Sequence, residues 1–200
     1  MGEIGKIVPP GKLIFGILVT SESVRSQCLD RLTAAFGPLD HQSHVELFTF
    51  TDYYCDEMGQ TIYRQYLSAQ RLVNLDDLPA LKHRTNEIEL DLARMDEQGR
   101  RCRQANVDPG YLTQSKVVLA STKDYGHRIY IAEGIFAEVT LYYRRPNGFQ
   151  PYPWTYPDYA RPEVCEFFNK VRETYRRQSQ GLDLPKGPKP HSDTEPDAET

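Results

Sequence analysis

Residues 104–143 have the sequence QANVDPGYLTQSKVVLASTKDYGHRIYIAEGIFAEVTLYY, which sets many polar side chains among apolar ones. Asp108-Pro109-Gly110 predicts a turn, because proline fixes φ and glycine permits positive φ. Thr113 can then cap a short helix over residues 114–121. The run VVLA inside that segment also suits a short strand, and of the two we expect the helix.

The second half of this stretch predicts a β-hairpin. Its strands cover residues 127–132 and 135–143, joined at Glu133-Gly134. A two-residue loop would place Ile129 opposite Glu138, with His127 on the same face as Glu138. Arg128 would then lie on the other face, which is otherwise apolar. A slip of one residue would exchange these partners, so the register can be checked directly.

Apolar periodicity outside this stretch predicts the remaining elements. A continuous apolar run over 13–19 is typical of a strand that is buried on both faces. Val24, Cys28, Leu32 and Phe36 recur every four residues and indicate an amphipathic helix, which ends before Gly37-Pro38. The other expected elements are strands over 44–51 and 60–67, a helix over 78–95, a basic turn over 97–104 and a helix over 163–178.

Together these elements predict an α+β fold. We expect a mixed, mostly antiparallel sheet of about six strands, with helices packed largely on one face. The β-α-β-β-α-β order through residue 112 resembles a ferredoxin-like unit, here extended by the hairpin. Residues 1–12 form a lead-in and 13–178 a single domain. The proline-rich residues 179–200 contain almost nothing apolar, and we expect them to be disordered.

Composition restricts the function classes. The 200 residues include 24 Lys and Arg against 28 Asp and Glu, and the resulting net charge of −4 argues against general nucleic-acid binding through counterion release. The four cysteines contain no CxxC pair of the kind found in zinc and redox sites. No apolar run approaches the roughly 20 residues of a membrane helix, so we expect no membrane partner and a cytoplasmic location. Glycine-rich nucleotide motifs are absent, and no cofactor is indicated.

The first candidate site is a cluster of basic side chains in the central stretch. Lys116 and Lys123 would share a face if the expected helix extended as far as residue 123, close to Arg128 and to the polar residues Asn106 and Asp108. Such a cluster suits an anionic, phosphate- or nucleotide-like small molecule. Trp154 and Tyr156 would stack on its ring. The alternative is a solvated charged face without a ligand.

Two further hypotheses concern different residues. His127 as a base oriented by Glu138, with Asp52 and Glu57 holding a metal, would suit a metal-assisted hydrolase or transferase. A structural His–Glu pair and solvated loop acids are the alternative for these residues. The aromatic segment 151–159 would suit a protein-interaction module. Whether the protein is an enzyme stays open at this point.

Several motifs resemble one uncharacterised bacterial and archaeal family, the domain-of-unknown-function family numbered 4416. These motifs are FTDYYCDEMG, TNEIE, NVDPGYLTQSKVVLASTKDYGHRIY, GIFAEVTLYY and PWTYPDY. The resemblance extends from about Leu13 to Gln178 and brings no activity or catalytic residue with it. The matching polar and aromatic positions include Asn86, Glu89 and Asp158 in addition to the candidate residues above. Because a core alone would not demand so many charged groups, the resemblance favours a functional site over pure packing.

Overall fold

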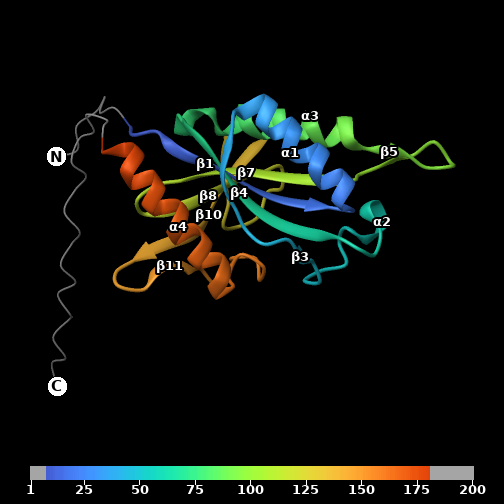
Figure 1. Cartoon of the computed structure of the whole chain (residues 1–200). Helices are drawn as coiled ribbons and strands as arrows, with labels where there is room; N and C mark the ends of the chain where they lie inside the picture. The colour runs from blue at the N-terminus through green and yellow to red at the C-terminus, as the bar shows by residue number, and fades with distance from the viewer. Residues whose placement is uncertain (1–7, 181–200) are drawn as a thin grey trace, which may run out of the picture.

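The computed structural model describes residues 8–180 and contains a nine-stranded sheet with helices on both of its faces (Figure 1). The main path of the sheet runs β11 (Gly148–Pro151), β10 (Ile135–Arg144), β8 (Lys116–Ser121), β7 (Ala105–Leu112), β1 (Gly11–Val19), β4 (Tyr63–Val73) and β2 (Leu39–Gln42). The short strand β3 (Glu46–Leu47) pairs with β4, and β9 (Ile129–Ala132) pairs with β10. The two-stranded ribbon of β5 (Arg94–Met95) and β6 (Arg101–Cys102) stands apart.

The expected ferredoxin-like unit is present in the middle of this sheet. Helix α1 (Glu22–Phe36) connects β1 to β2, and α3 (Leu78–Leu92), preceded by the 3-10 turn η1 (Leu75–Asp77), connects β4 to β7. The order β7-β1-β4-β2 is antiparallel at each pairing. The α+β class is therefore confirmed, although the sheet has nine strands instead of about six and every pairing between the described strands is antiparallel.

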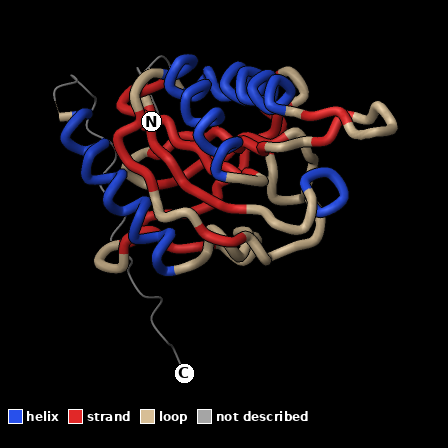
Figure 2. Tube along the Cα trace, turned by 45° about the vertical axis from the view of Figure 1, so that its right-hand side comes forward, coloured by secondary structure: helices blue, strands red, loops and turns tan. Residues whose placement is uncertain are grey.

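Helices α1 and α3 cover one face of the sheet, and α4 (Pro162–Ser179) covers the opposite face (Figure 2). The side chain of Ser21 caps α1 by accepting from the Val24 amide, and the four-residue apolar stripe packs on β1 and β4. Strand β1 is buried along its whole length, as expected, because it has a helix layer on each side. Helix α4 is thus the exception to the expected one-sided arrangement.

The edge of the sheet beside β4 differs from the prediction. Residues 44–51 were expected to form one strand, but only Glu46–Leu47 pairs, and 39–42 supplies the other piece. Val45 and Leu47 of that segment are exposed, so its alternating pattern does not mark a buried face. Strand β4 begins at Tyr63 and extends to Val73, beyond the expected 60–67. The basic turn over 97–104 contains the β5–β6 ribbon.

Two predictions for the central stretch are wrong. Asp108-Pro109-Gly110 lies inside strand β7, and residues 116–121 form strand β8 instead of a helix. Pro109 has no amide hydrogen to donate, and it lies just beyond the segment that pairs with β8, which begins at Gly110 opposite Leu119. A Cβ on Gly110 would lie 2.2 Å from the carbonyl oxygen of Val118, so this close approach requires glycine.

The hairpin is present, but its register is shifted by one residue. Ile135 faces Ala132, as a two-residue loop requires, whereas Phe136 faces Tyr130 and Ala137 faces Ile129. An irregularity between Ile135 and Phe136 causes the shift. The predicted pairing of Ile129 with Glu138 is therefore wrong.

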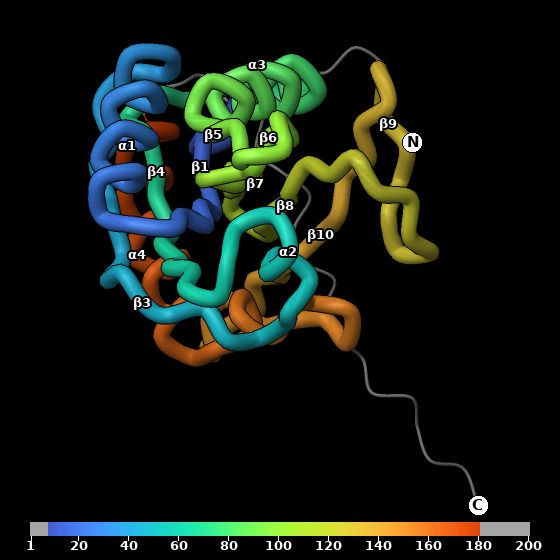
Figure 3. The backbone as a smooth tube through the Cα atoms, turned by 90° about the vertical axis from the view of Figure 1, so that its right-hand side faces the viewer, coloured from blue at the N-terminus to red at the C-terminus, as the bar shows by residue number. Residues whose placement is uncertain are grey.

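No helix within residues 8–180 is long and apolar enough to cross a membrane. The proline-rich segment expected to be disordered begins at residue 179, but Ser179 is the last residue of α4 and residues 181–200 lie outside the described part of the chain. Figure 3 faces the end of the molecule where the short helix α2 (Cys55–Met58) and the β5–β6 ribbon flank β7 and β8. The candidate site is at this end.

Candidate functional site

A cavity of about 550 Å³ opens where β7 and β8 separate. The two strands pair only over Gly110–Leu112, so the first half of β7 and the last residues of β8 form opposite walls. Helix α3 closes the cavity above β7, and residues around α2 lie at its mouth. A cavity of this volume is in the range of sites for small molecules. Its charged lining residues are Glu57, Arg64, Lys82, Glu89, Arg101, Arg103, Asp108, Lys123, Arg128, Glu138 and Asp158.

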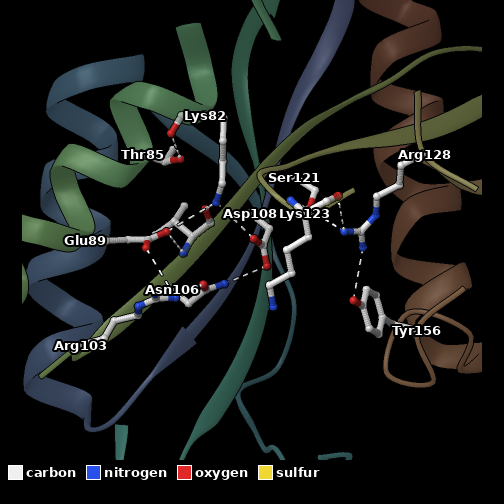
Figure 4. Close-up of polar contacts among 11 residues, drawn as sticks. Lys82, Thr85, Glu89, Arg103, Asn106, Asp108, Ser121, Lys123, Arg128 and Tyr156 are labelled. Carbon is white, nitrogen blue, oxygen red and sulfur yellow. Dashed lines mark hydrogen bonds and ion pairs between the residues drawn. The ribbon is translucent and has the colours of Figure 1, made fainter. Parts of the chain in front are cut away.

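One wall, formed by α3 and β7, is held together by Lys82 (Figure 4). Its ammonium donates to the Val107 carbonyl at 2.9 Å and to Asp108 Oδ1 at 3.3 Å, and lies 3.7 Å from Glu89 Oε1. Glu89 also accepts from the Val107 amide at 2.8 Å. Burial raises the pKa of Glu89, and the charge of Lys82 partly offsets this effect. The Asn106 amide donates to Asp108 Oδ2 at 2.9 Å, so both carboxylate oxygens are fixed in place.

The opposite wall is organised by Arg128, whose side chain is almost completely buried. Its Nε donates to Glu138 Oε2 at 2.9 Å, and Nη1 donates to the Ser121 hydroxyl at 2.6 Å and to the Lys123 carbonyl at 3.1 Å. Nη2 donates to the Tyr156 hydroxyl at 3.3 Å. Burial works against the charge, but Glu138 outweighs it, and the pKa of Arg128 is raised. Arg128 therefore fixes the turn that carries Lys123.

Lys123 differs from the other cations in this wall because its ammonium forms no ion pair within residues 8–180. The Nζ atom lies 3.7 Å from the centroid of the Tyr53 ring, at the mouth of the cavity. The exposed Arg101 of β6 is the other lining cation without an ion pair in the described residues. Lys123 is therefore the partly buried charge that a ligand can reach without breaking a salt bridge.

The floor of the cavity contains a buried ion pair. Arg64 Nε donates to Asp158 Oδ2 at 2.7 Å, and the Tyr66 hydroxyl donates to the same oxygen at 3.2 Å. Arg64 Nη1 and the Tyr159 hydroxyl are buried and have no hydrogen-bond partner among the described residues. A Cβ on Gly16 would lie 2.1 Å from the Tyr159 hydroxyl, so β1 needs glycine where this tyrosine crosses it.

The cavity brings together most, but not all, of the residues singled out from the sequence. Its lining includes Glu57, Asn106, Asp108, Lys123, Arg128, Glu138 and Tyr156. Lys116 is not part of the lining: it begins β8, at the far end of the strand from Ser121, so the two lysines do not share a helix face. Asp52, His127 and Trp154 also lie outside the lining. Within residues 8–180, no group of three or more potential metal ligands is present.

His127 and Glu138 are in contact, at 3.1 Å between Nε2 and Oε2. The Glu138 carboxylate also accepts hydrogen bonds from two other residues. Oε2 accepts from Arg128, and Oε1 accepts from the Thr140 hydroxyl at 3.2 Å. The His127 ring stacks on Trp154 at 5.9 Å, outside the cavity. These contacts favour a positioning role for Glu138, in which it orients Arg128.

Several lining residues were given no role from the sequence: Arg64, Lys82 and Arg103 were not singled out, and Glu89 and Asp158 were named only as positions that match the family motifs. Lys82 and Glu89 are seven residues apart on α3, beside its apolar stripe, and their near-complete burial could be inferred only from where α3 meets β7. Arg64 did carry a signal, because it stands among apolar residues in a strand. Its partner Asp158 lies 94 residues away, a distance that no local pattern spans.

A family model described as "Domain of unknown function (DUF4416)" matches residues 9–175 of the chain. No curated protein matches the chain, and neither does any solved structure.

Proposed function

The chain belongs to the DUF4416 family, and from the cavity we propose that it binds an anionic small molecule there. The observation that carries this proposal is the state of the lining charges. Each carboxylate that lines the cavity already has a cationic partner among the described residues, whereas Lys123 has no anionic one. An ammonium without a counter-ion in a concave, partly apolar site attracts a phosphate or carboxylate group.

The surroundings of Lys123 support the same proposal. Arg128 donates to the Ser121 hydroxyl and to the Lys123 carbonyl, so the lysine extends from a fixed turn and loses little freedom on binding. The rings of Tyr53 and Tyr156 line the mouth beside it and provide surface for the uncharged part of a ligand. Binding by one principal ammonium should weaken as ionic strength rises.

Isothermal titration with inorganic phosphate, ethyl phosphate and propionate tests the proposal. We expect binding by at least one of them, and a loss of about tenfold or more in affinity in Lys123→Gln. Lys116→Gln is the matched control, because Lys116 begins β8, the strand that leads to Lys123, but lies outside the cavity lining. The proposal fails if none of the three binds and their amine-bearing analogues O-phosphoethanolamine and β-alanine do not bind either, or if the two variants lose affinity equally.

The hydrolase hypothesis has one supporting observation, the contact between His127 and Glu138. An imidazole outside the cavity lining, next to a carboxylate that already accepts from Arg128 and Thr140, supports it less well than the cavity supports binding. Activity that depended on His127 and survived in Lys123→Gln would favour the hydrolase hypothesis instead.

A further inference from the structure

The two walls of the cavity carry opposite excess charge. On the α3–β7 wall, one ammonium serves two carboxylates: Lys82 lies 3.3 Å from Asp108 Oδ1 and 3.7 Å from Glu89 Oε1. Arg103 lies 3.4 Å from Glu57 and offsets the charge of that carboxylate. Its distance from Glu89 is longer, at 4.0 Å. Apart from Arg101 of β6, which is exposed and forms no ion pair among the described residues, this wall therefore has more carboxylates than cations.

The β8–β10 wall has the reverse excess. Arg128 and Glu138 form one closed pair, with side chains only 4% and 2% exposed. Lys123 remains as the additional positive charge. Strands β7 and β8 separate beyond their short paired segment and form opposite walls of the cavity. The wall with β7 has an unbalanced carboxylate, and the wall with β8 has an unbalanced ammonium.

Each wall offers a charged group to a ligand, Asp108 on one and Lys123 on the other, whereas the more exposed Glu57 and Arg103 pair with each other. The Asp108 side chain is 26% exposed, while Lys82 and Glu89 beside it are nearly buried. Each Asp108 oxygen accepts one hydrogen bond, from Lys82 or Asn106, and retains acceptor capacity. Figure 4 shows the Lys123 side chain extending toward the space beside Asp108 and Asn106. Lys123 and Asp108 line the same cavity and form no ion pair with each other in the described structure, so both remain available to a ligand.

We infer that the ligand is zwitterionic, with an anionic group for Lys123 and a protonated amine for Asp108. The inference rests on the proposed function and specifies its ligand class. A ligand with only negative charge would bring its other end against the Asp108 carboxylate, whose one cationic partner, Lys82, is shared with Glu89. An amine at that end turns the repulsion into attraction and uses the free acceptor positions.

The aromatic lining adds to this selectivity. The faces of aromatic rings attract cations, and five aromatic side chains line the cavity: Phe48, Tyr53, Tyr54, Tyr156 and Tyr159. Small amino acids and amine-bearing phosphate esters have the required pair of charges a few bonds apart. Both classes fit easily within about 550 Å³.

Matched pairs of small compounds test the inference on the full-length protein by isothermal titration. O-Phosphoethanolamine is compared with ethyl phosphate, and β-alanine with propionate; each pair differs by the amine, and the two pairs separate a phosphate from a carboxylate ligand. We expect the amine-bearing member of at least one pair to bind about tenfold more tightly, as for one partly desolvated charge pair. This comparison uses the wild-type protein and needs no variant to fold.

The variant Asp108→Asn then tests whether the amine of the ligand binds to Asp108. We expect this variant to bind the amine-free anion more tightly, because the repulsion is removed, and to lose the preference for the amine, whereas Lys123→Gln weakens both members of the pair. Equal or tighter binding of the amine-free anion in the wild type overturns the inference but leaves the proposed function standing. A preference that persists in Asp108→Asn also overturns it. If neither member of either pair binds, the proposed function fails as well.

Discussion

Removing the charge of Asp158 should destabilise the fold strongly, because it leaves the buried Arg64 without its counter-ion. Asp158 is 2% and Arg64 7% exposed, and two guanidinium nitrogens donate to Asp158 Oδ2. Asp158→Asn preserves the size of the side chain but leaves a cation surrounded by the rings of Phe48, Tyr66 and Tyr159. Removing one partner of such a pair costs about 3–5 kcal/mol, whereas an exposed pair contributes about 1 kcal/mol or less.

Urea denaturation of the wild type and the variant measures this difference in the free energy of unfolding. The matched control is Asp91→Asn, which breaks the ion pair between Arg31 and Asp91 at 2.7 Å, with side chains 43% and 61% exposed. We expect the control to lose about 1 kcal/mol or less. Equal, small losses of unfolding free energy in Asp158→Asn and Asp91→Asn would refute the reasoning. Burial would then not determine how much breaking an ion pair destabilises the protein. In thermal denaturation, the larger loss corresponds to roughly 6–20 °C in Tm.

Two further variants and one labelling experiment test other parts of the fold. Gly110→Ala should destabilise by about 1–3 kcal/mol in urea, because its Cβ would meet a carbonyl oxygen at 2.2 Å, while Gly126→Ala, with open space around it, should be neutral. Because burial raises the pKa of Glu89, the free energy of unfolding of the wild type should fall as the pH rises from about 4.5. Glu89→Gln removes this titration, so the free energy of unfolding of the variant should depend less on pH. The same slope of unfolding free energy against pH in both proteins would contradict this. Burial raises the pKa of the Cys28 thiol to about 12, so iodoacetamide at neutral pH should label Cys102 before Cys28, as read by peptide mass spectrometry.

Periodic segments of the chain could be predicted well from the sequence. The four-residue apolar spacing of α1 and the continuous apolar run of β1 both correspond to observed burial. These patterns predict burial correctly because an apolar face packs against a whole layer of the fold. Its burial therefore does not depend on the position of any single partner residue. The βαββαβ unit follows from them in order.

The central stretch could not be predicted in the same way. Strand β8 is buried on both faces over Val117–Ala120, so it has no alternation to distinguish it from a helix. Asp-Pro-Gly is a turn signal in isolation, yet here Pro109 lies where β7 leaves β8 and has no hydrogen bond to that strand to lose. Only part of the site could be predicted from the sequence. Lys123 and Arg128 are neighbours in one loop, whereas Lys82 and Asp158 come from distant parts of the chain and meet them only in the folded protein.

The separation of β7 from β8 also links occupancy of the cavity to the interior of the sheet. Both walls continue directly into the short ladder between Gly110–Leu112 and Val117–Leu119. Any molecule that draws the walls together lowers the frequency with which this ladder opens, so its amide protons should exchange with deuterium more slowly when the cavity is filled. Exchange at those few amides would thus report a bound guest whose identity was still unknown.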